Sequence, residues 1–86
     1  MTTLKTDISI IFQEERENTV YTLCQINIHG LIKYAVAIAN EQGSDFELID
    51  TDRDRSCDFF KKALEFQLSP IHLKDTVRDH IIEFIV

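Results

Sequence analysis

Apolar and polar residues alternate between residues 4 and 49, with the period of two that is typical of strands. A polar segment at 13–19 and the glycine at Gly30 divide this half of the chain, and a last short strand is expected at 46–49. Connections this short favour antiparallel neighbours, because parallel strands need a crossover of about a dozen residues. We therefore expect an antiparallel β-meander of three or four strands.

The two faces of the expected strands differ in bulk. In the first strand, Ile8, Ile10 and Phe12 are two residues apart and are expected to share a face. In the strand at 31–40, one face carries Lys33 and a row of alanines. The opposite face of that strand is bulkier: Ile32, Tyr34, Val36 and Ile38. We expect helices to cover this bulkier face, because its burial removes more apolar surface from water.

From residue 53 onward, apolar residues recur every three or four positions, as on one side of a helix. The first helix has this apolar stripe: Cys57, Phe60, Ala63, Leu64 and Leu68. The apolar stripe of the second helix consists of Leu73, Val77, Ile81, Phe84 and Ile85. Between them, Ser69 is placed to cap a helix whose first residue is Pro70.

These patterns predict an α+β fold of the order ββββαα in a single domain, residues 1–86. An antiparallel sheet spans 4–49, and a two-helix layer over 53–85 packs on one face of it.

The acidic segment DTDRDRSCD, at 50–58, resembles the start of a calcium-binding loop, with Asp50, Asp52 and Asp54 at alternate positions. The sixth position of such a loop requires a glycine and the twelfth a glutamate. Arg55 and Lys61 occupy these positions here, so we expect no calcium site. The segment instead predicts a helix start, capped by Asp52, Asp54 or the neighbouring threonine.

The chain carries fifteen acidic and nine basic residues, a net charge of −6. This balance disfavours a nucleic acid or an anionic membrane surface as a partner, since both require a basic patch. The start MTTLKTDISI lacks the apolar run of a secretory signal, and no segment has about 18 consecutive apolar residues. With two well-separated cysteines, Cys24 and Cys57, we expect a cytoplasmic protein with reduced thiols, although one disulfide remains the alternative.

No nucleophile motif, zinc-protease motif or glycine-rich phosphate loop occurs in the chain. Cys24 and Cys57 fall on apolar faces, where burial makes a thiol unreactive. We therefore expect neither an enzyme nor a cofactor. A deep pocket lined by Cys24 or His29 would be the structural sign of the enzyme alternative.

The polar side of the last helix offers the candidate binding residues His72, Asp75, Asp79 and His80. His72 and His80 are two helical turns apart, about 12 Å, which is too far for both to bind one metal ion. We therefore assign no metal site. A small-molecule or metal-binding sensor that uses these four residues is the alternative to an interaction protein.

Both expected helices carry apolar residues beside their main stripes. These residues and Phe84, the last aromatic residue of the chain, form the candidate interface: Phe59, Phe66, Ile82 and Phe84. Either both helices are buried on two sides, or the excess forms an interface. We expect a small non-enzymatic protein, an adaptor or regulator, that binds a protein partner or itself as a homodimer through the helical layer.

The segment LSPIHLKDTVRDHI, residues 68–81, resembles the C-terminal helix of a group of short bacterial proteins of unknown function. That group combines a β-rich N-terminal half with a helix opened by S-P-I/V-H-L. The matching residues here are Ser69, Pro70, Ile71, His72, Leu73 and Asp75. The resemblance covers the last third of the chain and implies a bacterial cytoplasmic protein without a known activity.

Overall fold

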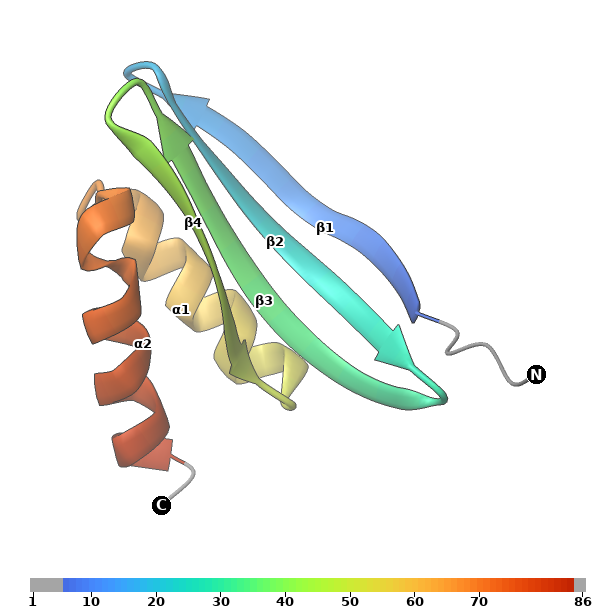
Figure 1. Ribbon diagram of the computed structural model, residues 1–86. Coiled ribbons are helices and arrows are strands. Elements are labelled where there is room, and N and C mark those ends of the chain that lie inside the picture. The colour runs from blue at the N-terminus through green and yellow to red at the C-terminus, as the bar shows by residue number, and fades with distance from the viewer. Residues whose placement is uncertain (1–5, 85–86) are drawn as a thin grey trace.

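The computed structural model describes residues 6–84, although not the side chain of Phe84. It contains these elements: β1 (Thr6–Arg16), β2 (Thr19–Ile28), β3 (Leu31–Asn40), β4 (Gly43–Asp50), α1 (Arg53–Glu65) and α2 (Pro70–Phe84). The strands form one antiparallel sheet in the order β1-β2-β3-β4, and both helices lie on the same side of it (Figure 1). The predicted ββββαα fold is confirmed. The predicted positions at residues 4, 5 and 85 lie outside the described residues.

β3 has the predicted bounds, whereas β1 and β4 are longer than predicted because the turns beside them are tight. β1 continues through Arg16, so the polar turn expected at 13–19 shrinks to Glu17 and Asn18, with φ of 49° and 65°. The next turn contains His29 and Gly30, with φ of 51° and 87°. Two consecutive positive φ values are those of the type I′ turn, whose twist matches that of a β-hairpin.

A β-bulge in β1 makes one prediction wrong. Ile10 pairs with Cys24, whereas Phe12 pairs with the next residue of β2, Leu23, so Ile11 is the extra residue. Because a shift of one residue moves the following side chains to the other face, Phe12 does not share a face with Ile10. Phe12 instead lies on the helical side, where its ring stacks on that of Phe60 at 6.3 Å between centroids.

The core lies between the sheet and the helices, on the face predicted from β3. Its buried residues are Tyr21, Leu23, Tyr34, Val36, Ile38, Ile49, Phe59, Phe60, Leu64, Leu73 and Val77. Ile32 is partly buried against the same cluster. Tyr34, Val36 and Ile38, which the alternation placed on the bulkier face of β3, are therefore all buried. The predicted layer arrangement is confirmed.

The helix starts agree with the sequence in part. Asp52, one of the three predicted candidates, caps α1, since its carboxylate accepts a hydrogen bond of 2.9 Å from the Arg55 N–H. Pro70 is the first residue of α2, also as predicted. The Ser69 hydroxyl does not make the predicted capping bond: it is buried without a hydrogen-bond partner, and the Ser69 carbonyl accepts from the His72 N–H instead. Neither helix within residues 6–84 is long and apolar enough to cross a membrane.

Candidate functional site

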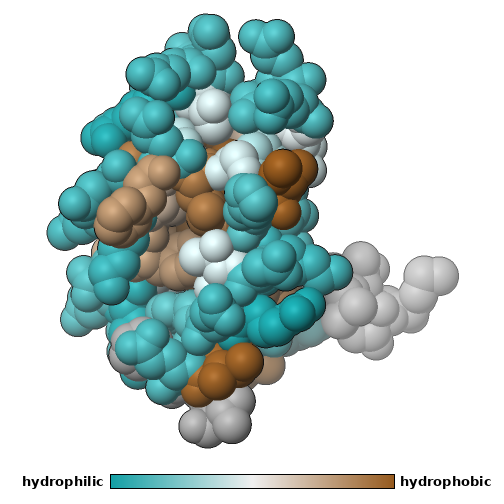
Figure 2. Space-filling model, turned by 90° about the vertical axis from the view of Figure 1, so that its left-hand side faces the viewer, coloured by the Kyte–Doolittle hydropathy of each residue, from teal (hydrophilic) through white to brown (hydrophobic). Residues whose placement is uncertain are grey.

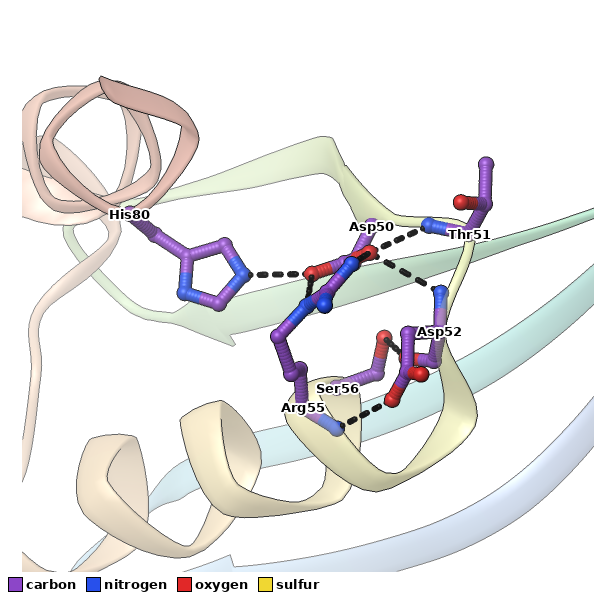
Figure 3. A network of polar contacts seen from close by, with 6 residues as sticks. All are labelled: Asp50, Thr51, Asp52, Arg55, Ser56 and His80. Atoms are coloured by element: carbon purple, nitrogen blue, oxygen red, sulfur yellow. Dashed lines mark hydrogen bonds and ion pairs between the residues drawn. The ribbon is translucent and has the colours of Figure 1, made fainter. Parts of the chain in front are cut away.

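A buried carboxylate connects the end of the sheet to both helices (Figure 3). Asp50, the last residue of β4, is 5% exposed and accepts hydrogen bonds from the backbone N–H groups of Thr51 and Asp52 at 2.7 and 2.9 Å. The Arg55 guanidinium of α1 binds both carboxylate oxygens, with Nε 2.8 Å from Oδ2 and Nη2 3.0 Å from Oδ1. His80 of α2 places Nε2 2.9 Å from Oδ2.

The electrostatics of this cluster keep Asp50 ionised. The bond from Arg55 lowers the pKa of the Asp50 carboxyl far below its ordinary value, against the opposing effect of burial. The bonds from the two backbone N–H groups and from His80 lower the pKa further. The His80 ring also has an aromatic neighbour, because the Phe59 ring meets it edge-on at 5.3 Å.

The cluster joins three elements of the fold, because Asp50 of β4 binds Arg55 of α1 and His80 of α2. An aspartate that orients a histidine also occurs in hydrolases, but there the histidine activates a nucleophile. The adjoining hollow of about 240 Å³ is lined by Arg55, Asp58, Phe59, Lys62, Thr76, Asp79, His80 and Glu83. Its one hydroxyl, that of Thr76, donates to the His72 carbonyl at 2.9 Å. The cluster therefore holds β4, α1 and α2 together.

The predicted polar site on the last helix is not assembled. His80 is buried and bound to Asp50, whereas His72, Asp75 and Asp79 are exposed on the surface of α2. Within residues 6–84, no group of three or more histidine, cysteine, aspartate or glutamate side chains is placed to hold a metal ion. The Asp50–His80 contact has no signal in the sequence, because thirty residues separate the two.

The predicted interface residues also do not form one exposed surface. Phe59 is 7% exposed and belongs to the core, whereas Phe66 and Ile82 are 74% and 59% exposed. Phe59 is buried because α2 lies across it and brings His80 onto its ring. The side chain of Phe84 lies outside the described residues. Seen from the helical side, apolar residues occur at separate places in a mainly hydrophilic surface (Figure 2).

The two cysteines lie on opposite sides of the sheet. Cys24 is buried on the side away from the helices, and Cys57 of α1 packs against the helix-side core. Both are free thiols, so the alternative of a disulfide between them is wrong for this structure. Burial raises the pKa of the Cys24 thiol, as the sequence interpretation required. His29 is exposed at a turn, where it lines a hollow of about 200 Å³ with Asp7, Asn27 and Gly30.

The sheet face opposite the helices, which we call the open face, carries exposed apolar residues that no described helix or strand covers. The strand register places Ile10, Cys24, Ala35 and Leu48 in one row across all four strands. Its outer members, Ile10 and Leu48, are 61% and 46% exposed. Other exposed apolar residues on this face are Ile8, Leu31 and Phe46.

The open face also carries few charges. Glu15 pairs with Val20 at one end of β2, and Lys33 pairs with Ile26 towards the other end. The strand positions between them on this face are apolar or uncharged. One sequence signal could have revealed this surface: apolar residues stand on both faces of the second and third strands, whereas a solvated face is expected to be polar.

Comparison of the chain with protein-family models, curated proteins and solved structures gives no match. The resemblance of residues 68–81 to a group of short bacterial proteins therefore stays a prediction.

Proposed function

We propose that this protein acts by protein–protein interaction, without an enzymatic activity, and that its partner on the open face of the sheet is a second copy of the chain. The single observation that carries the proposal is the apolar row across the four strands, with Ile10 and Leu48 exposed at its ends. Exposed apolar residues that gather on one face of a sheet are typical of a binding surface. The earlier hypothesis of an interface on the helical layer has weaker support, because Phe59 is in the core.

The size of the open face suits self-association. Strands of about ten residues, at ~3.3 Å per residue and ~4.8 Å between strands, give a four-stranded face a flat area of about 600 Å². Two copies would together bury about 1,200 Å², above the ~1,000 Å² that separates specific interfaces from incidental contacts. Two twisted sheets pack face to face at about −30°, as in a β-sandwich.

The charge distribution favours a second copy over a charged partner. Each chain has a net charge of −6, which opposes self-association at most of its surface. The open face avoids this repulsion, because its described charges are one glutamate, Glu15, and one lysine, Lys33, near opposite ends. Two such faces are apolar where they meet and are close to neutral.

A cytoplasmic setting is part of the proposal. The supporting observation is that both cysteines are free thiols, as is usual in proteins of a reducing compartment.

The experiment compares two charge insertions by multi-angle light scattering after gel filtration. Ile10→Asp places a carboxylate in the open face, and Phe66→Asp makes a comparable change at a residue of the helical layer that is 74% exposed. We expect a wild-type mass that is a multiple of 10.0 kDa, halved by Ile10→Asp and unchanged by Phe66→Asp. Dissociation by Phe66→Asp alone would return the interface to the helical layer, and a wild-type mass of 10.0 kDa would refute self-association.

A further inference from the structure

We infer that a second, separate self-association surface lies along the outer edge of β4, where β4 of another copy pairs antiparallel to it and fills the groove beneath α2. This inference extends the proposed self-association to a different surface. The groove measures about 590 Å³. Phe46, Glu47 and Leu48 of β4 line one side of it, and residues of α2 line the other: Lys74, Val77, Arg78, Ile81 and Ile82.

β4 is an edge strand of the sheet, so one side of its backbone has no neighbouring strand. The Phe46 N–H shows the consequence, because it donates to the carboxylate of the preceding residue, Asp45, at 2.9 Å. A second strand would offer a carbonyl acceptor to this N–H. Addition of a strand to such an edge is an established mode of recognition, in which backbone hydrogen bonds provide affinity and side-chain pockets provide specificity.

The charges that line the groove favour a second copy of β4 as its occupant. Lys74 and Arg78 of α2 make the helix side of the groove basic. On β4, Asp45 and Glu47 pair with Ile38 and Val36 of the core face, so both carboxylates lie on the side of α2. A second β4 therefore presents two carboxylates to the basic side of the groove.

The apolar residues of β4 lie on the other side of the strand. Phe46 and Leu48 pair with Ala37 and Ala35 on the open face. Pairing of two β4 strands therefore joins the open faces of two copies into one continuous surface.

The isolated chain keeps the Glu47 carboxylate of β4 in an unfavourable environment. Burial raises the pKa of Glu47, and a hydrogen bond and the charge of Asp45 raise it further, against the opposing charge of Lys74. Arg78 of a second copy would relieve this repulsion. An antiparallel pair of identical strands is also related by a two-fold axis, so each contact occurs twice and the assembly closes.

The opposite edge of the sheet is less suited to the same pairing. In β4 the register shifts only at Ile49, next to the end of the strand. β1 contains the bulge at Ile11, in the middle of the strand, which interrupts a regular ladder. It also ends in a charged segment, in which Glu14 and Arg16 form an ion pair. Bulges and charges of this kind are the devices by which sheets protect an edge.

Two different two-fold surfaces, the open face and the β4 edge, give a closed tetramer of about 40 kDa from chains of 10.0 kDa. Arg78→Glu is expected to halve this mass by placing six acidic groups, three from each copy, around each edge contact. Arg53→Glu is the matched control, since Arg53 is an exposed residue of α1 outside the groove. The charge exchange Glu47→Arg with Arg78→Glu is expected to restore the wild-type mass.

The outcomes separate this inference from the proposed function. A mass that Ile10→Asp halves and Arg78→Glu leaves unchanged overturns the edge pairing and keeps the open face. The reverse result keeps the edge pairing and overturns the open-face assignment. Hydrogen exchange provides a second readout: we expect the Phe46 amide to exchange at least tenfold faster in Arg78→Glu than in Arg53→Glu, and equal rates would overturn the pairing.

Discussion

Asp50→Asn tests the buried cluster that connects β4, α1 and α2. The wild-type carboxylate accepts from two backbone N–H groups, from two nitrogens of Arg55 and from His80. An asparagine keeps one oxygen, which can serve the backbone groups. Its amide nitrogen is a donor that faces other donors, and the charge that pairs with Arg55 is lost.

The expected loss of stability is large for a domain of this size. Removal of one partner of a buried ion pair costs about 3–5 kcal/mol. The lower value applies here, because the Arg55 side chain is 39% exposed and can regain hydration. A chain of 86 residues has a free energy of unfolding of about 4–13 kcal/mol, so a loss of ~3 kcal/mol is a substantial share of it. The melting temperature should fall by about 12–24 °C.

The pH dependence of this loss follows from the direction of the pKa shift. The folded-state pKa of Asp50 is lowered below that of an unfolded aspartate, about 3.9. The contribution of the ionised carboxyl is therefore complete above pH ~4 and is lost as the pH falls through the folded-state pKa. The stability difference between wild type and Asp50→Asn should be full at pH ~5 and should shrink towards pH ~2.

Urea unfolding followed by far-ultraviolet circular dichroism measures this difference. The proteins are compared at one fixed concentration, because self-association adds to apparent stability. Asp54→Asn is the control, since Asp54 is an exposed acidic residue in the first turn of α1. The charge of such a residue stabilises a helix by about 0.3–1 kcal/mol. A loss for Asp50→Asn no larger than that of Asp54→Asn, or a difference that grows in acid, would refute the reasoning.

Three further predictions concern single residues. Asp52→Ala should lower the free energy of unfolding by about 1 kcal/mol and Asp52→Asn by much less in the same urea assay, because asparagine also caps helices; equal losses would count against the cap. Gly30→Ala should cost about 1–2 kcal/mol by thermal unfolding, because Gly30 has a φ of 87° and β-carbons are strained there, and an unchanged melting temperature would contradict the turn geometry. Iodoacetamide should label Cys57 before Cys24 in the folded protein, as peptide mass spectrometry can show, because Cys24 is 5% exposed and has a raised pKa; the reverse order would place Cys24 at an accessible surface.

The layers of the fold were predictable because the sequence patterns repeat over many residues. The period of two in β3 identified the face that carries Val36 and Ile38, and the spacing of α1 identified Phe60 and Leu64 as core residues. Capping preferences placed the start of α1 in the acidic segment and included Asp52 among three candidate caps. Each of these features depends on neighbours in the sequence.

The features that failed depend on single residues or on distant ones. One extra residue in β1 moved Phe12 to the helical side, and no periodicity signals such a bulge. His80 was assigned to the polar side of its helix, but in the fold it binds Asp50 and its ring packs against that of the buried Phe59. Contacts of this kind are determined by packing geometry, which one helix or strand alone does not contain.

The most direct test of the central claim is the mass of Ile10→Asp beside that of the wild type, measured by sedimentation equilibrium over a series of concentrations. We predict that the wild type associates, and that Ile10→Asp folds but has half the wild-type mass. A wild type that remains at 10.0 kDa at every concentration, or an Ile10→Asp variant that folds and keeps the wild-type mass, would contradict self-association through the open face.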